Sequence, residues 1–178
     1  MKKIVITGGP STGKTSIITE IEANGYACMP EISRQITLDA RNSGIEHLFL
    51  TDPILFSIKL LDGRTQQFKD AENLQKNIVF FDRGIPDVLA YLNGTETDNK
   101  QHFVDASSKY KYDIVFILPP WKEIHTQDNE RYEDFDEAQR IHGLLEKTYT
   151  ELGYAPIDVP IGTIADRTQF ILNAIKIH

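Results

Sequence analysis

The chain has 178 residues, 40% of them hydrophobic and 25% charged, with a net charge of −7 and a pI near 5.2. These values fit one soluble globular domain with a sizeable core, which we expect to span residues 1–178. The acidic balance argues against general binding to nucleic acids or anionic membranes, and one cysteine with no membrane-length apolar stretch is typical of a cytoplasmic protein.

Short apolar runs alternate with segments of helical spacing along the whole chain. Such runs, rich in β-branched and aromatic residues, are typical of buried parallel strands. We predict strands over Ile4–Thr7, Tyr26–Met29, Ile78–Phe81, Ile114–Leu118 and Tyr154–Val159. We predict helices over Lys14–Ala23, Glu31–Asn42, Pro53–Asn73, Pro86–Leu92, Gln101–Lys111, Asp136–Gly153 and Thr163–Ile177. This order predicts an α/β fold with three layers, in which helices flank a parallel sheet of about five strands.

A glycine-rich loop follows the first predicted strand. Gly8–Thr15 satisfies the pattern G-x-x-x-x-G-K-[S/T] in full, with a strand before it and a helix after it, as a P-loop requires. The loop N–H groups and the helix N-terminus would face the phosphates of a nucleotide, Lys14 would reach the β- and γ-phosphates, and the Thr15 hydroxyl would ligate Mg²⁺. The residues expected to bind the nucleotide here are Gly8, Gly9, Pro10, Ser11, Thr12, Gly13, Lys14, Thr15 and Ser16.

Polar residues follow two other predicted strands, at the edge where ligands bind in parallel α/β sheets. Asp82 suits Mg²⁺, and the alternative is a helix N-cap ahead of Gly84. Arg83 either grips an acceptor or phosphoryl group or is a solvated arginine. Glu31 and Arg34 lie where an acid of an acceptor site would lie, although Glu31 would equally suit the first turn of a helix.

Residues 121–140 form a polar stretch that we expect to act as a lid within the domain. Asp128, Arg131 and Arg140 belong to this stretch. The arginines would close over the triphosphate and stabilise charge in the transition state, or the stretch is a solvated surface segment with salt bridges. Arg167 precedes the last predicted helix, and it would stack on a nucleobase or lie on the surface.

Taken together, these motifs resemble a known family. The motifs are Ile4–Thr15, Pro30–Arg34, Phe81–Asp87, Pro119–Trp121, Asp128–Arg131 and Asp166–Leu172. In this order they resemble the small AAA-type ATPase domains related to the nicotinamide riboside kinase domain of the bacterial NAD-biosynthesis regulator. The resemblance implies a P-loop NTPase fold of the nucleoside- or nucleotide-kinase type that binds ATP or GTP with Mg²⁺. It also implies functional roles for Glu31, Arg34, Asp82, Arg83, Asp87, Arg131 and Arg167.

The first functional hypothesis is a kinase that transfers the γ-phosphoryl group of ATP to a small nucleoside- or nucleotide-like acceptor. Lys14 would hold the phosphates, and Thr15 with Asp82 would hold Mg²⁺. The acceptor would contact Glu31, Arg34, Arg83 and Asp87, with Asp82, Glu31 or Asp87 orienting its hydroxyl as base. Arg83 and Arg131 would neutralise the developing charge.

The second hypothesis is a binding module that changes conformation with bound ATP or GTP and hydrolyses it slowly. Its switch would be the segment Trp121–Phe135, and its partner would be a protein or a lipid. A kinase needs an open, polar acceptor pocket beside the γ-phosphate, lined by Glu31, Arg34 and Arg83. The sequence has no N-K-x-D run of the kind that selects guanine, which favours ATP over GTP.

Overall fold

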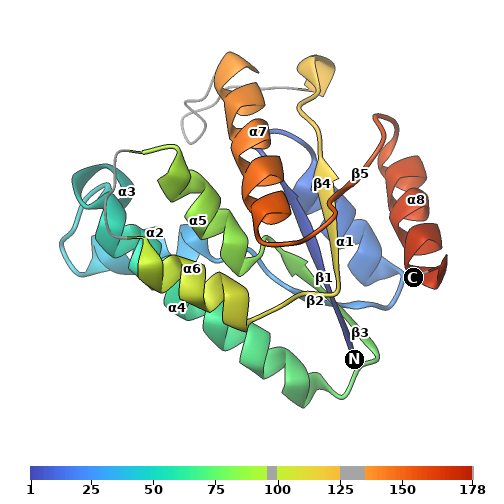
Figure 1. The fold of residues 1–178 in the computed structure, drawn as a ribbon, viewed down its shortest axis with the longest axis horizontal. Coiled ribbons are helices and arrows are strands. Elements are labelled where there is room, and N and C mark those ends of the chain that lie inside the picture. Colours follow the sequence, from blue (N-terminus) through green and yellow to red (C-terminus); the bar gives the residue numbers. More distant parts are fainter. Residues whose placement is uncertain (96–99, 125–134, 178) are drawn as a thin grey trace.

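Five parallel strands form the centre of the molecule, in the order β2-β3-β1-β4-β5 (Figure 1). The computed structural model describes residues 1–95, 100–124 and 135–177. The strands are β1 (Lys2–Gly8), β2 (Ala27–Met29), β3 (Ile78–Asp82), β4 (Ile114–Leu118) and β5 (Ile157–Asp158). The α-helices are α1 (Lys14–Ala23), α2 (Ser33–Asn42), α3 (Leu48–Thr51), α4 (Pro53–Asp70), α5 (Ile85–Asn93), α6 (Gln101–Lys109), α7 (Phe135–Glu151) and α8 (Ile164–Ile177).

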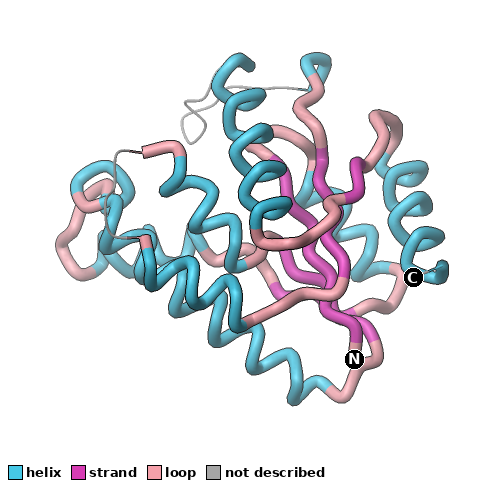
Figure 2. The backbone as a smooth tube through the Cα atoms, in the orientation of Figure 1, coloured by secondary structure: helices cyan, strands magenta, loops and turns pink. Residues whose placement is uncertain are grey.

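The sheet lies between two helical layers, as Figure 2 shows. Successive side chains of a strand point to opposite faces, so each strand contributes to two hydrophobic clusters. Val5 and Phe81 pack with residues of α4, α5, α6 and α7, whereas Ile4 and Phe80 pack with residues of α1 and α8. This double burial explains why β1, β3 and β4 are nearly continuous apolar runs in the sequence.

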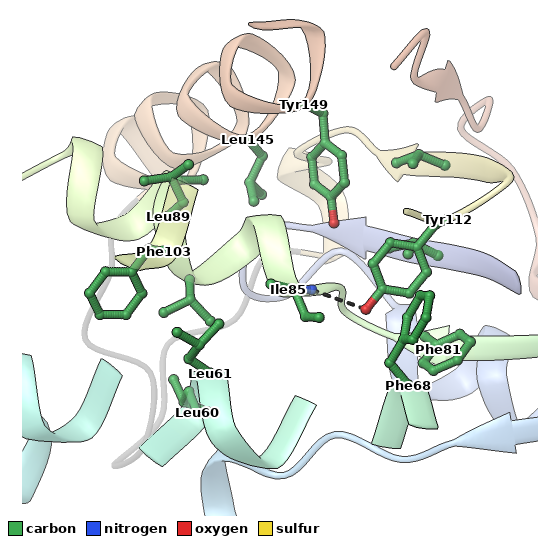
Figure 3. Close-up of a cluster of buried hydrophobic side chains, with 14 of the residues drawn as sticks. Leu60, Leu61, Phe68, Phe81, Ile85, Leu89, Phe103, Tyr112, Leu145 and Tyr149 are labelled. Atoms are coloured by element: carbon green, nitrogen blue, oxygen red, sulfur yellow. Dashed lines mark hydrogen bonds between the residues drawn. The ribbon is translucent and has the colours of Figure 1, made fainter. Parts of the chain in front are cut away.

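The larger cluster is rich in aromatic side chains (Figure 3). Phe68 of α4 packs edge-on against Tyr112, with 5.2 Å between the ring centroids, and Tyr112 also contacts Phe81 of β3. The Tyr112 hydroxyl accepts a hydrogen bond of 3.2 Å from the backbone N–H of Ile85, the first residue of α5. The core thereby fixes the start of α5, which lies directly after the polar end of β3.

The predicted α/β class and all five predicted strands are confirmed, with shorter limits at the last one. Residues 154–156 do not extend β5 because Tyr154 is bonded into the turn that follows α7. Its N–H donates to the carbonyl of Tyr149, and its hydroxyl accepts from the N–H of Tyr112. The short helix α3 was not predicted, and α4 ends at Asp70 in a 3-10 turn, Ala71–Leu74, rather than continuing to Asn73.

The expectation of one domain over residues 1–178 stays a prediction, as does the lid around residues 121–140, of which 125–134 lie outside the described residues. Trp121 is partly exposed and is followed by the short 3-10 turn Lys122–Ile124. None of the helices in the described part of the chain is long and apolar enough to cross a membrane.

Candidate active site

The glycine-rich loop between β1 and α1 has a backbone that only small residues adopt easily. Gly8 and Gly13 have φ values of 147° and 84°, and Ser11 has a φ of 55°. A Cβ atom on Gly8 would also lie 2.7 Å from the carbonyl oxygen of Leu118, the last residue of β4. The neighbouring strand end and the loop conformation together require glycine at this position.

The ammonium group of Lys14 lies inside this loop. Its Nζ donates to the carbonyl of Gly9 at 2.6 Å and to Thr12 Oγ1 at 3.3 Å, and the side chain is buried. Burial, followed by repulsion from Arg83, lowers the pKa of Lys14 to about 7, although nearby carboxylates oppose the shift. The loop therefore holds a cation in a poorly solvated position, where an added negative charge would be strongly stabilised.

We expect nucleotide binding to be coupled to uptake of a proton by Lys14. With a pKa of about 7, the side chain should be mainly neutral at pH 8 in the free protein. Phosphate oxygens beside it would raise this pKa, so about one proton at most should be taken up. Titration calorimetry with Mg·ADP in two buffers of different ionisation enthalpy measures this number. Uptake should be smaller at pH 6, where Lys14 is already protonated, and zero uptake at pH 8 would contradict the expectation.

Asp82 ends β3, directly beside the loop. It pairs in register with Ile6 of β1, and it is only 7% exposed. Burial raises the pKa of Asp82, against the attraction of Lys14 and Arg83. Its Oδ1 atom has no hydrogen-bond partner within the described residues.

The orphaned oxygen of Asp82 fits a magnesium site. Thr15 is exposed in the first turn of α1, so a carboxylate and a hydroxyl are available at this edge of the sheet. Both are the hard oxygen ligands that Mg²⁺ takes, and phosphate oxygens would complete the coordination. The alternative that Asp82 is a helix N-cap is wrong, because Asp82 lies within β3 and the N-cap of α5 is Gly84.

Arg83 lies between the end of β3 and the start of α5, and its side chain contacts the glycine-rich loop. It adopts a left-handed backbone conformation, with a φ of 74°, and its N–H donates to the carbonyl of Ile6. Its guanidinium donates to the carbonyl of Gly8 at 3.2 Å and to Asp87 Oδ1 at 3.3 Å. A non-glycine residue in this conformation carries backbone strain, which the surrounding contacts must offset. Arg83 is therefore held against the phosphate loop and is not a solvated surface arginine.

Asp87 is fully buried and accepts hydrogen bonds from four groups. Oδ1 accepts from the Thr7 hydroxyl at 2.6 Å and from Arg83, and Oδ2 accepts from the Gly84 N–H at 2.9 Å and from the Tyr149 hydroxyl at 2.5 Å. The arginines Arg64 and Arg83 and these donors lower its pKa, although burial alone would raise it. The oxygens of Asp87 already accept from β1, α7 and the turn after β3. A contact between Asp87 and an acceptor substrate stays a prediction.

Glu31 lies between β2 and α2, two residues ahead of the helix that was predicted to include it. It accepts hydrogen bonds from the N–H and the hydroxyl of Ser33, and its Oε1 lies 3.6 Å from Arg64 Nη2. These bonds and the charges of Arg64 and Arg83 lower its pKa despite partial burial. Glu31 is a partly exposed carboxylate near Arg83, and Arg34 is exposed in the first turn of α2.

Of the remaining predicted site residues, the structure describes Arg167 and Arg140. Arg167 of α8 is 2% exposed and donates to the carbonyl of Thr12 at 2.9 Å, so it supports the loop from behind; its stacking on a nucleobase stays a prediction. Arg140 of α7 is half-exposed and pairs with Glu137 through two hydrogen bonds of 2.7 Å. Arg131 and Asp128 lie outside the described residues.

Three residues at the site were not identified from the sequence. Arg64 of α4 is buried and donates to the Gly84 carbonyl at 2.9 Å, while Thr7 and Tyr149 bind Asp87. A signal existed for Arg64, because it falls on the buried face of α4 that also carries Leu61 and Phe68. A charged residue at a core-facing helix position requires a partner, which a reading of helix periodicity can detect.

Two cavities occur elsewhere on the surface. One of about 150 Å³ lies between α5 and α7, where Tyr91 and Arg140 line it. Another of about 310 Å³ lies between α2 and α4, where Asp39 and Lys59 line it. Neither is lined by Glu31, Arg34 or Arg83, so the predicted acceptor pocket beside the loop stays a prediction.

Comparisons with known proteins agree with this geometry. A family model described as an AAA domain matches residues 3–167. No curated protein matches the chain.

Several solved kinases share the fold. A deoxyadenosine kinase from M. mycoides, with the products dCMP and a flexible dCDP bound, superposes with a TM-score of 0.74 at 19% identity, over 99% of this chain and 100% of that one. The NadR protein in complex with NR superposes with a TM-score of 0.74 at 18% identity, over 98% of this chain and 48% of that one. A shikimate kinase from Acinetobacter baumannii in complex with shikimate superposes with a TM-score of 0.58 at 17% identity, over 99% of this chain and 93% of that one. At these identities the likeness shows the fold, which is that of small P-loop kinases.

Proposed function

The chain belongs to the AAA domain family, and from that premise we propose that it is a Mg²⁺-dependent kinase that transfers the γ-phosphoryl group of ATP to a hydroxyl of a small nucleoside- or nucleotide-like acceptor. One observation carries the proposal. The Lys14 ammonium lies inside a loop that fits phosphates, with Arg83 bonded to the loop and Asp82 on the adjacent strand. The charge of Glu31 acts on the pKa values of Lys14 and Asp82. Phosphoryl transfer depends mainly on such charge placement, since the protein itself does little covalent chemistry.

On the nucleotide side, the loop N–H groups and Lys14 would bind the β- and γ-phosphates. The Thr15 hydroxyl and the Oδ1 atom of Asp82, which has no partner among the described residues, would hold Mg²⁺. The ion would neutralise charge on the phosphates when bound. Arg83 donates a hydrogen bond to the Gly8 carbonyl, so its guanidinium lies at the loop. There it would stabilise negative charge that develops on the transferred phosphoryl group.

On the acceptor side, Glu31 is the best candidate for the group that orients the hydroxyl. Asp87 is fully buried among four donors, and Asp82 is assigned to the metal. Glu31 is partly exposed, and its lowered pKa keeps it ionised at neutral pH. A carboxylate of low pKa is a weak base but a good hydrogen-bond acceptor, which suits a loose transition state that needs an aligned hydroxyl more than an early proton transfer.

The alternative is a switch that binds ATP or GTP and hydrolyses it slowly. Most of its expected moving segment, residues 121–135, lies outside the described residues. A switch has no need of an ionised carboxylate held beside Arg83 on the acceptor side. We therefore favour the kinase, with ATP as the donor.

The test is turnover of Mg·ATP, and of Mg·GTP in parallel, with a panel of nucleosides, nucleotides and nicotinamide riboside. We expect one acceptor to stimulate ADP formation strongly and to give a phosphorylated product by mass spectrometry. The Lys14→Ala protein serves as the inactive control. Tight nucleotide binding with slow hydrolysis that no acceptor stimulates would reject the kinase and favour the switch.

A further inference from the structure

The segment that carries Glu31 is held from one side by helix α4. Gln67 Nε2 donates to the carbonyl of Pro30 at 2.7 Å, and Arg64 Nη2 lies 3.6 Å from Glu31 Oε1. Gly63 lies on the same face of the helix, close to Ile32. A Cβ atom at this position would lie only 2.5 Å from Ile32 Cδ1, so glycine allows the two segments to approach closely. Three neighbouring positions of one helix thus contact three consecutive residues of the connection, and we call this set the α4 clamp (Gly63, Arg64 and Gln67).

Within the clamp, Arg64 makes a second contact across the site. Its Nη1 donates to the carbonyl of Gly84 at 2.9 Å. Gly84 follows β3, Glu31 follows β2, and these two strands are paired in register through Met29 and Phe81. One guanidinium therefore lies across the ends of two adjacent strands and sets the distance between the acceptor-side carboxylate and the turn that holds Arg83.

The burial of Arg64 makes this link rigid. The residue is 4% exposed, and its Nε has no hydrogen-bond partner within the described residues. A buried, incompletely paired cation is strongly attracted to the carboxylate it faces. At 3.6 Å the contact with Glu31 is an ion pair and not a hydrogen bond, which leaves the Glu31 oxygens able to accept from a further donor.

We propose that Arg64 is a positioning residue that fixes the Glu31 carboxylate against the Gly84 turn, and that it acts on phosphoryl transfer through Glu31. This inference rests on the proposed function. The competing explanation is that Arg64 only stabilises the fold, as a buried counter-charge for Asp87. The two explanations differ in whether the effect of replacing Arg64 depends on Glu31.

The kinetic test is a double-mutant cycle with wild type, Arg64→Met, Glu31→Gln and the double variant. Misplacement of Glu31 should lower kcat roughly 10²-fold in Arg64→Met, while KM for ATP changes less than about threefold. Glu31→Gln should lower kcat roughly 10³-fold, and adding Arg64→Met should lower it no further. Arg64→Lys should restore part of the loss, and Gln66→Met, an exposed position on the same helix, is the matched control.

Three outcomes would overturn the inference. If the effects of the two single variants multiply in the double variant, Arg64 acts independently of Glu31. If Arg64→Met lowers the melting temperature but leaves kcat of the folded fraction unchanged, its role is structural. The crystal structure of Arg64→Met gives a readout without activity, so it remains decisive if the wild type transfers no phosphoryl group and the proposed function fails. We expect a displaced Glu31 carboxylate, and an unmoved one would refute the inference.

Discussion

Replacing Lys14 with alanine should abolish nucleotide-dependent turnover without destabilising the protein. Lys14 is the buried ammonium inside the loop, and loss of a preorganised charge of this kind lowers kcat/KM by roughly 10³-fold. Its lowered pKa means that the folded state disfavours the protonated side chain, so Lys14 in this form lowers the free energy of unfolding. The Gly9 carbonyl keeps a second donor, the Thr12 hydroxyl at 3.0 Å, so the substitution leaves no unpaired acceptor.

The measurements are steady-state turnover at neutral pH and thermal unfolding at several pH values between about 7 and 10.5. Folding must remove Lys14 from water, and at pH values between about 7 and the ordinary value of 10.5 the unfolded state binds the extra proton. The wild type should therefore gain stability from this group as pH rises through that window, whereas Lys14→Ala should lack this dependence. Lys76→Ala removes an exposed lysine and is the control. Turnover near the wild-type rate in Lys14→Ala would remove the loop from the mechanism.

Replacing Asp87 should cause the largest loss of stability. Alanine at this position leaves the Thr7 and Tyr149 hydroxyls and the Gly84 N–H without this acceptor in the interior. It also removes the carboxylate that pairs with the Arg83 guanidinium. Removing one partner of a buried charge pair costs about 3–5 kcal/mol of unfolding free energy, which chemical denaturation at pH 7 measures. Tyr149→Phe removes one donor only and should cost about 1–3 kcal/mol.

The pH dependence of the loss of stability identifies the Asp87 carboxylate as its cause. The folded-state pKa of Asp87 lies below its ordinary value of 3.8, so its contribution is complete above 3.8 and is lost as pH falls through the folded value. The stability difference between wild type and Asp87→Asn should accordingly narrow in acid. Asp105→Asn, at an exposed position on α6, is the control. A cost below about 1 kcal/mol for Asp87→Ala would show that the four contacts contribute little.

Local patterns in the sequence predicted the elements that depend on local physics. The apolar runs that became β1, β3 and β4 must be buried on both faces, and their composition alone indicates this. Helix α4 begins where Asp52 and Pro53 predict, and Asp52 accepts the capping bond from Leu55 N. The glycine-rich loop between β1 and α1 was equally predictable, because its glycines adopt backbone angles that only glycine adopts freely.

The sequence by itself therefore determined the α/β class, the five strands and the glycine-rich loop, each specified by residues close together in the chain. Only the tertiary structure decided what surrounds the loop. Arg64 of α4 contacts Glu31 and Gly84, which lie in the connections after β2 and β3. Asp87 binds Thr7 and Tyr149, which are 80 and 62 residues away in the sequence. Which donor reaches which acceptor depends on how the helices pack on the sheet, and periodicity records that a position is buried but not which group it faces.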